Sequence, residues 1–116
     1  MTAAEAVAQF VADALVGCAE TAPMRGSLFG SPGMNREDGP PTYACILGAA
    51  HYGWAVRTGR TPWSIRPSDH DPDIVAAYHA RYGDTPAGDN DAHGRDYALA
   101  RMKHLADELN AAEGPS

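Results

Sequence analysis

One stretch of the chain, "TYACILGAAHYGWAVRTG" at residues 42–59, constrains the fold more than any other. Between residues 44 and 50 it is apolar on every side, and a helix of that kind must be covered by other elements. The stretch therefore predicts a central, buried helix at about 43–58. Gly48 and Gly53 each cost about 1 kcal/mol relative to alanine in a helix interior. We expect these glycines to let a neighbouring helix approach closely.

Three further segments carry apolar residues at the three- and four-residue spacing of a helix with one buried face. They are residues 3–19, 72–82 and 90–112. The first begins with a capping box, in which Thr2 accepts a hydrogen bond from the backbone and Glu5 reaches back. With the central helix, these segments predict a compact all-α bundle of about four helices.

Length and composition set the domain organisation. The chain has 116 residues, close to the commonest domain size, so we expect one small helical domain over 1–116. It contains 22 alanines, so large core side chains are few and dimerisation would add burial. Residues 20–42 hold four glycines and four prolines, which predicts a long loop without regular structure. The tail at 113–116 is expected to be frayed.

The charge balance excludes some classes of partner. With a net charge of −6, the chain has no electrostatic attraction for a phosphate backbone, so we expect no nucleic-acid partner. It has no run of 18 apolar residues and no charged leader before a long apolar stretch, so we expect a cytoplasmic protein that does not enter a membrane. The glycines of "GSLFGSPG" match neither a phosphate loop nor a dinucleotide fingerprint, and we expect no cofactor.

Two acidic segments, "SDHDPD" and "DNDAH", combine carboxylates with imidazoles and are the candidates for a divalent-metal site. They contain Asp69, His70, Asp71 and Asp73, and Asp89, Asp91 and His93. Their spacing matches no specific metal-binding motif, and both segments come directly before predicted helices, where acids favour the positive end of the helix dipole. Helix capping is the preferred interpretation. A metal-binding module or metal-dependent hydrolase is the alternative.

Two sets of apolar and aromatic residues are candidates for binding. The first, in the long loop, is Met24, Leu28, Phe29 and Met34. These residues either fold back over the core or form a partner-binding surface. The second set, which could line a small-molecule pocket, is Trp54, Trp63, Tyr78 and Tyr82. Each of these aromatics could equally belong to the core.

The pattern of Cys45, Gly48 and Ala49, a Cys-x-x-Gly-Ala segment, recurs with an Asn-Asp pair, Asn90 and Asp91, before the last predicted helix. In this the chain resembles a family of short proteins of unknown function from actinobacteria and their phages. The resemblance covers most of the chain and implies origin and fold rather than an activity. Eight of the nine basic residues are arginine, which agrees with a high-GC genome.

Nucleophilic catalysis needs a nucleophile, a base and an orienting group brought together. Cys45 and His51 are the only nearby pair, and their six-residue separation places them on opposite sides of a helix. We therefore expect a non-enzymatic, acidic interaction protein of phage or actinobacterial origin that binds a host or partner protein. Asn90 and Asp91 are expected to act as helix caps, with side chains that accept backbone N–H groups.

Overall fold

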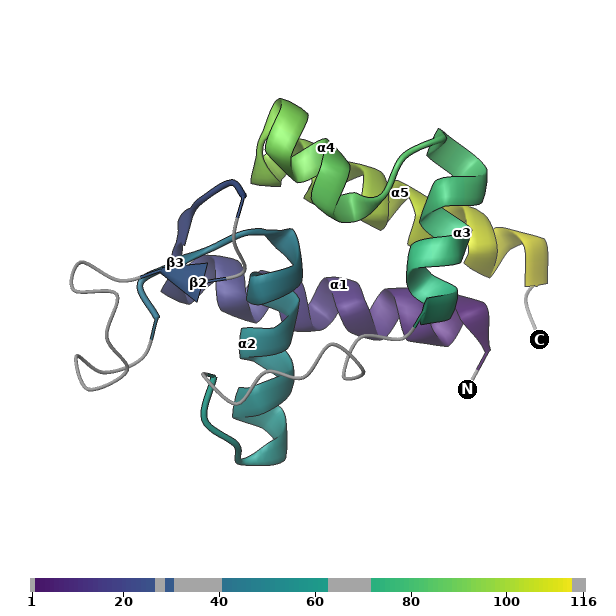
Figure 1. Cartoon of the computed structure of the whole chain (residues 1–116). Coiled ribbons are helices and arrows are strands. Elements are labelled where there is room, and N and C mark those ends of the chain that lie inside the picture. The colour runs from purple at the N-terminus through teal and green to yellow at the C-terminus, as the bar shows by residue number, and fades with distance from the viewer. Residues whose placement is uncertain (1, 27–28, 31–40, 63–71, 114–116) are drawn as a thin grey trace.

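A computed structural model of the chain describes residues 2–26, 29–30, 41–62 and 72–113, which form five helices and three two-residue strands. The helices are α1 (Ala3–Glu20), α2 (Ile46–Thr58), α3 (Pro72–Tyr82), α4 (Pro86–His93) and α5 (Arg95–Glu113). The strands are β1 (Ala22–Pro23), β2 (Phe29–Gly30) and β3 (Tyr43–Ala44). Figure 1 shows α1 running through the middle of the molecule, with α2 crossing it. The fold is mostly helical, as predicted, but it has one helix more than the four expected.

The two ends of α1 show how local sequence sets a helix boundary. The Thr2 hydroxyl accepts a hydrogen bond from the Glu5 backbone N–H at 3.1 Å, which confirms the predicted cap. At the other end, the Thr21 hydroxyl donates to the Gly17 carbonyl at 2.6 Å. Thr21 itself is extended, so the chain leaves α1 directly into β1.

The start of α2 differs from the prediction. Residues 43 and 44 form β3, which pairs parallel with β1 and antiparallel with β2. The Thr42 carbonyl accepts from the Ala22 N–H at 2.8 Å, so the chain here is held in a sheet and the helix begins later. Cys45 is the N-cap, with its Sγ accepting from the Gly48 N–H at 3.4 Å. The expectation that residues 20–42 contain no regular element was wrong, because pairing with β3 stabilises two short strands there.

The final predicted helix, 90–112, is two helices. Thr85 caps α4 by accepting from the Gly88 N–H at 3.0 Å, and Pro86 follows at the first helical position. Gly94, with φ of 99°, interrupts the helical path and α5 begins at the next residue. Asn90 and Asp91 therefore lie inside α4 and do not mark the start of the last helix, α5.

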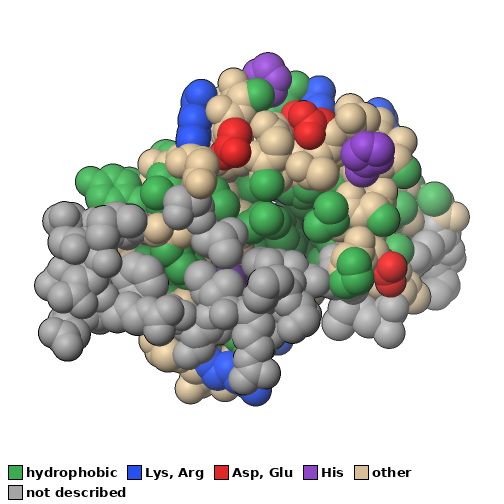
Figure 2. Space-filling model, viewed as in Figure 1, with side chains coloured by type: hydrophobic (Ala, Val, Ile, Leu, Met, Phe, Trp, Pro, Cys, Tyr) green, Lys and Arg blue, Asp and Glu red, His purple; other side chains and the backbone are tan. Residues whose placement is uncertain are grey.

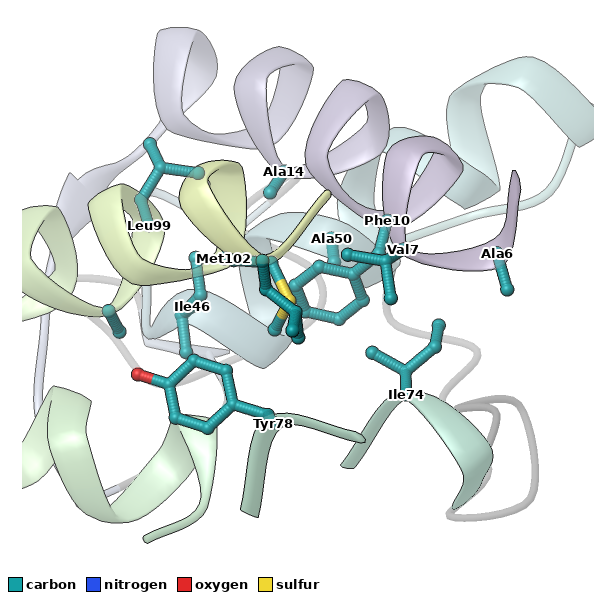
Figure 3. Close-up of a cluster of buried hydrophobic side chains, with 12 residues drawn as sticks. Ala6, Val7, Phe10, Ala14, Ile46, Ala50, Ile74, Tyr78, Leu99 and Met102 are labelled. Carbon is teal, nitrogen blue, oxygen red and sulfur yellow. The ribbon is translucent and has the colours of Figure 1, made fainter. Parts of the chain in front are cut away.

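The main core lies where α1, α2, α3 and α5 meet (Figure 3). Its larger side chains are Val7, Phe10, Ile46, Ile74, Tyr78, Leu99, Met102 and Leu105. As predicted, α2 is the more buried of the first two helices, with eight of its 13 residues buried against seven of 18 in α1. A smaller cluster beside the strands joins Phe29, Ala44, Ala49 and Tyr52.

The crossing of α1 and α2 depends on two glycines. A Cβ placed on Gly17 would lie 1.9 Å from the Ala49 carbonyl oxygen of α2. A Cβ placed on Gly53 would lie 2.0 Å from the Asp13 carbonyl oxygen of α1. Neither distance is compatible with a real side chain, so the two backbones touch at reciprocal points. The predicted role of Gly53 is confirmed, and Gly17 supplies the matching contact from α1.

Candidate functional site

A buried carboxylate, that of Asp89, ties α3, α4 and α5 together. Its Oδ2 accepts from the Tyr78 hydroxyl at 2.5 Å and from Arg101 Nη1 at 3.0 Å. Burial, followed by the hydrogen bond to this carboxylate, raises the pKa of Tyr78 above its ordinary value. Asp89 is 3 % exposed and two residues bind its Oδ2, so this carboxylate belongs to a structural network.

Asn90 and Asp91 satisfy backbone N–H groups, but those of distant segments. Asn90 is fully buried; its Oδ1 accepts from the Ile46 N–H at 2.8 Å, while its Nδ2 donates to the Met24 carbonyl at 2.8 Å. Asp91 Oδ1 accepts from the Gly26 N–H at 2.7 Å. Asn90 thus caps the first residue of α2 and holds the chain after β1. Helix capping is therefore confirmed for Asn90, although at α2 and not at the last helix, and was wrong for Asp91, because Gly26 belongs to no helix.

Arg95, the first residue of α5, was not singled out by the sequence. It is 5 % exposed, and its guanidinium reaches across to the end of α1 and to β3. Nη1 donates to the Thr21 hydroxyl at 2.9 Å and to the Ala44 carbonyl at 3.1 Å, and Nη2 donates to the Thr21 carbonyl at 3.0 Å. Nη2 also lies 3.5 Å from the Cys18 carbonyl. Among the described residues, none offers an acceptor to its Nε. No local pattern marks a buried arginine in "AHGRDY".

A pocket of about 280 Å³ opens where the chain after β1 meets the junction of α4 and α5. It is lined by Pro23, Met24, Arg25, His93, Gly94, Arg95 and Asp96. The Arg25 guanidinium lies over Gly94, since its Nη2 would be 3.4 Å from a Cβ at that position. Arg25 is fixed there because its Nη1 donates to the Asp91 carbonyl at 3.3 Å. The lining residues therefore include two arginines and a histidine, against one aspartate.

A row of stacked rings and guanidinium groups runs from this pocket across α5 to α3. The centroids of the His93 and Tyr97 rings are 4.3 Å apart. The Arg101 Cζ lies 4.6 Å from the centroid of the Tyr97 ring and 4.7 Å from that of the Tyr82 ring. Arg81 completes the row 4.9 Å from Tyr82. We call these five residues the Arg–Tyr stripe. Figure 2, which views one face of the molecule, shows histidine, arginine and acidic side chains along its upper part, with hydrophobic side chains gathered below them.

Both arginines of the stripe are held by carboxylates. Arg81 makes two hydrogen bonds to Glu108, at 2.7 and 3.0 Å, and this pairing lowers the pKa of Glu108. Arg101 pairs with buried Asp89. Arg101 is thus anchored on a buried carboxylate, whereas the pair of Arg81 and Glu108 lies at the surface and Tyr97 is 36 % exposed.

The metal-site candidates are only partly described. Asp69, His70 and Asp71 lie outside the described residues. Of the second segment, Asp89 and Asp91 are used as set out above, and His93 stacks on Tyr97. Within residues 2–26, 29–30, 41–62 and 72–113, no group of three His, Cys, Asp or Glu side chains lies close enough together to hold a metal ion.

The aromatic candidates fall in separate places. Tyr78 and Tyr82 stack on α3 with their rings 4.9 Å apart, and Tyr78 is in the core. Trp54 lies on α2, 5.1 Å from the His51 ring, with Arg60 4.8 Å above it. Trp63 lies outside the described residues. The described aromatics do not share one pocket.

The loop candidates also divide. Phe29 is 5 % exposed and belongs to the smaller core cluster, so it packs on the core and does not form a partner-binding surface. Met24 is half-buried and lines the pocket. Leu28 and Met34 lie outside the described residues. Both cysteines are free thiols, and burial raises the pKa of Cys18 and of Cys45, which makes their reactive thiolate forms scarcer.

No family model, curated protein or solved structure matches this chain. Among the helices described here, none is long and apolar enough to cross a membrane.

Proposed function

We propose that this chain is a non-enzymatic binding module that docks on a partner protein through the Arg–Tyr stripe. The single observation that carries the proposal is the stacked row of Tyr97, Arg101 and Tyr82, which is anchored on buried Asp89 and open to solvent at Tyr97. Tyrosine and arginine are the residue types enriched among those that contribute most to protein–protein affinity. The composition indicates a high-GC genome, and the actinobacterial or phage origin that the resemblance implies would supply the partner.

The fixed geometry of the stripe supports this role. Ordering a long side chain on binding costs roughly 0.5–1.5 kcal/mol, and that cost is reduced where the side chain is already held. Here Arg81 is held by Glu108 and Arg101 by Asp89, while their flat faces cover the tyrosine rings. The partner surface that fits such a row presents flat apolar or aromatic groups with carboxylates at the edges.

The proposal is tested by replacing the exposed tyrosine of the stripe, Tyr97→Ala. We expect capture of the partner from a high-GC bacterial lysate to fall at least about tenfold, because a central tyrosine in an interface contributes on the order of 2 kcal/mol. Tyr97→Phe, which keeps the ring, should retain capture. Val56→Ala removes an apolar side chain from α2 that is 56 % exposed, and serves as the matched control.

Two results would count against the stripe. One is recovery of the same proteins, in the same amounts, by wild type and Tyr97→Ala. The other is an equal loss with Val56→Ala. A thermal unfolding curve for each variant checks that the comparison is made between folded proteins.

A further inference from the structure

We propose that the pocket between residues 23–25 and 93–96 binds a small oxyanion, with the phosphate dianion as the preferred class. This inference goes beyond docking on a partner protein and does not depend on it. In this pocket, a chain of net charge −6 brings two arginines and a histidine to one concave surface. Three observations lead to it.

The first observation is the charge of the walls. Arg25, His93 and Arg95 contribute basic groups, against the single carboxylate of Asp96. The pocket also lies at the N-terminus of α5, a helix of 19 residues. The first backbone N–H groups of a helix have no intrahelical acceptor and carry a partial positive charge. The walls therefore hold an excess of positive charge.

The second observation is the uncompensated charge of Arg95. Arg95 is only 5 % exposed. Within the described part of the chain, its hydrogen bonds all go to neutral oxygens, those of Cys18, Thr21 and Ala44. Its Nε–H is the one buried side-chain polar group in the described part of the chain that lacks an acceptor. Burying a guanidinium without a counter-charge is unfavourable. An anion in the adjoining pocket would provide that counter-charge.

The third observation is shape. A volume of about 280 Å³ is at the small end of ligand sites, which suits a phosphate group or a small phosphate monoester rather than a large ligand. Arg25 lies over Gly94, and a planar guanidinium can donate two parallel hydrogen bonds to one oxyanion. Phosphate carries more charge than acetate at neutral pH, so the same walls should prefer it.

The test is a titration of the isolated protein with inorganic phosphate at constant ionic strength, followed by the backbone amide signals in NMR. We expect saturable shifts centred on Gly94, Arg95 and Asp96, and weaker binding of acetate. Arg25→Gln should lower the phosphate affinity about tenfold, the effect of losing a charge-assisted hydrogen bond. Asp96→Asn removes the opposing carboxylate and should raise the affinity.

Arg60→Gln removes the same charge after the far end of α2 and is the matched control, for which the affinity should stay within about twofold of wild type. A parallel titration with glycerol phosphate asks whether a monoester binds as the free anion does. The proposal is overturned if the shifts do not saturate, if they occur away from residues 94–96, or if Arg25→Gln binds phosphate as tightly as wild type. Equal affinities for acetate and phosphate would remove the phosphate preference. Because no partner protein is present, these outcomes are independent of whether the stripe docks on one.

Discussion

The middle of α2 and its first turn are held in different ways. At the middle, Gly53 lies against the backbone of α1, and Gly17 of α1 lies against the backbone of α2. At the first turn, the side chain of Asn90 from α4 accepts the Ile46 N–H and binds the Met24 carbonyl. The contact at the middle depends on two glycines that have no side chain, and the contact at the first turn depends on one buried polar side chain.

The difference explains where a ligand can enter. Two backbones in direct contact leave no space and expose no unused donor. The region around the first turn is instead assembled from side chains that span between segments, namely Asn90, Asp91 and Arg95. These contacts join the segments through polar side chains, and the pocket lined by Arg25 and Arg95 lies beside them. Binding is therefore expected at the polar junction, and the glycine crossing acts as the rigid support.

The largest effect is expected at the glycine crossing. Gly53→Ala places a methyl group 2.0 Å from the Asp13 carbonyl oxygen, and Gly17→Ala places one 1.9 Å from that of Ala49. Because backbone atoms cannot swing aside, the helices must separate. We expect each substitution to lower the free energy of unfolding by about 3 kcal/mol, the upper end of the cost of overpacking, despite the higher helix propensity of alanine. Urea unfolding measures the loss.

Gly59→Ala is the matched control for this crossing. A Cβ at Gly59 would meet open space, but its φ is 72°. The substitution should therefore cost only the strain of a left-handed residue, about 1 kcal/mol. If Gly53→Ala costs no more than Gly59→Ala, close backbone contact is not what holds α1 and α2 together.

The sequence predicts those parts of the molecule that local pattern controls. The Thr2 cap, the extent of α3 and the close approach at Gly53 all follow from neighbouring residues and their spacing. The boundary between α4 and α5 was also encoded locally, by Thr85 and Pro86 at the start of α4 and by Gly94 at its end. The boundary was missed because Asp89 and Asp91 are equally typical of the N-terminus of a single long helix.

The remaining features depend on partners far along the chain. Asn90 and Ile46 are 44 residues apart, and Arg95 and Thr21 are 74 apart. No periodicity in the sequence links such pairs, so neither the buried arginine nor the pocket beside it could be predicted. The strand at Tyr43 was missed for the same reason, because its pairing with Ala22 is set by the tertiary fold.

The second effect in size is expected at Asn90. Asn90→Ala removes the acceptor of the Ile46 N–H and the donor to the Met24 carbonyl in a fully buried place. The buried Ile46 N–H left unpaired costs roughly 1–3 kcal/mol, whereas the part-buried Met24 carbonyl can bind water instead, so we expect a total loss of about 2 kcal/mol in the free energy of unfolding. Hydrogen exchange at the Ile46 amide should accelerate as well. Asp91→Ala, at an exposed position, is the control and should cost about 0.5 kcal/mol. Equal costs for the two variants would show that the first turn of α2 does not depend on Asn90.

The smallest effect is expected at Tyr78, where shape and polar contact coincide. Its ring packs in the core while its hydroxyl donates to Asp89. Tyr78→Phe keeps the ring and removes the hydrogen bond, so we expect a loss of about 1.5 kcal/mol in the free energy of unfolding at pH 7, the value for a hydrogen bond to a charged group. Tyr82→Phe, which loses a hydrogen bond to the neutral Arg101 carbonyl, is the comparison and should cost about 1 kcal/mol.

The pH dependence of this difference tests whether the Tyr78 hydroxyl is buried and bound as the structure shows. Because the pKa of Tyr78 is raised in the folded protein, the unfolded chain releases that proton first, from about pH 10 upward. The folded state then binds more protons than the unfolded state, so stability must fall as pH rises, by up to about 1.4 kcal/mol per pH unit. The contribution is fully present below pH 10, and Tyr78→Phe lacks it. The advantage of wild type over Tyr78→Phe should therefore shrink between pH 9 and pH 11 in urea unfolding. An advantage that stays constant over this range would mean that the pKa of Tyr78 is not raised in the folded protein, and hence that its hydroxyl is neither buried nor held by the Asp89 carboxylate.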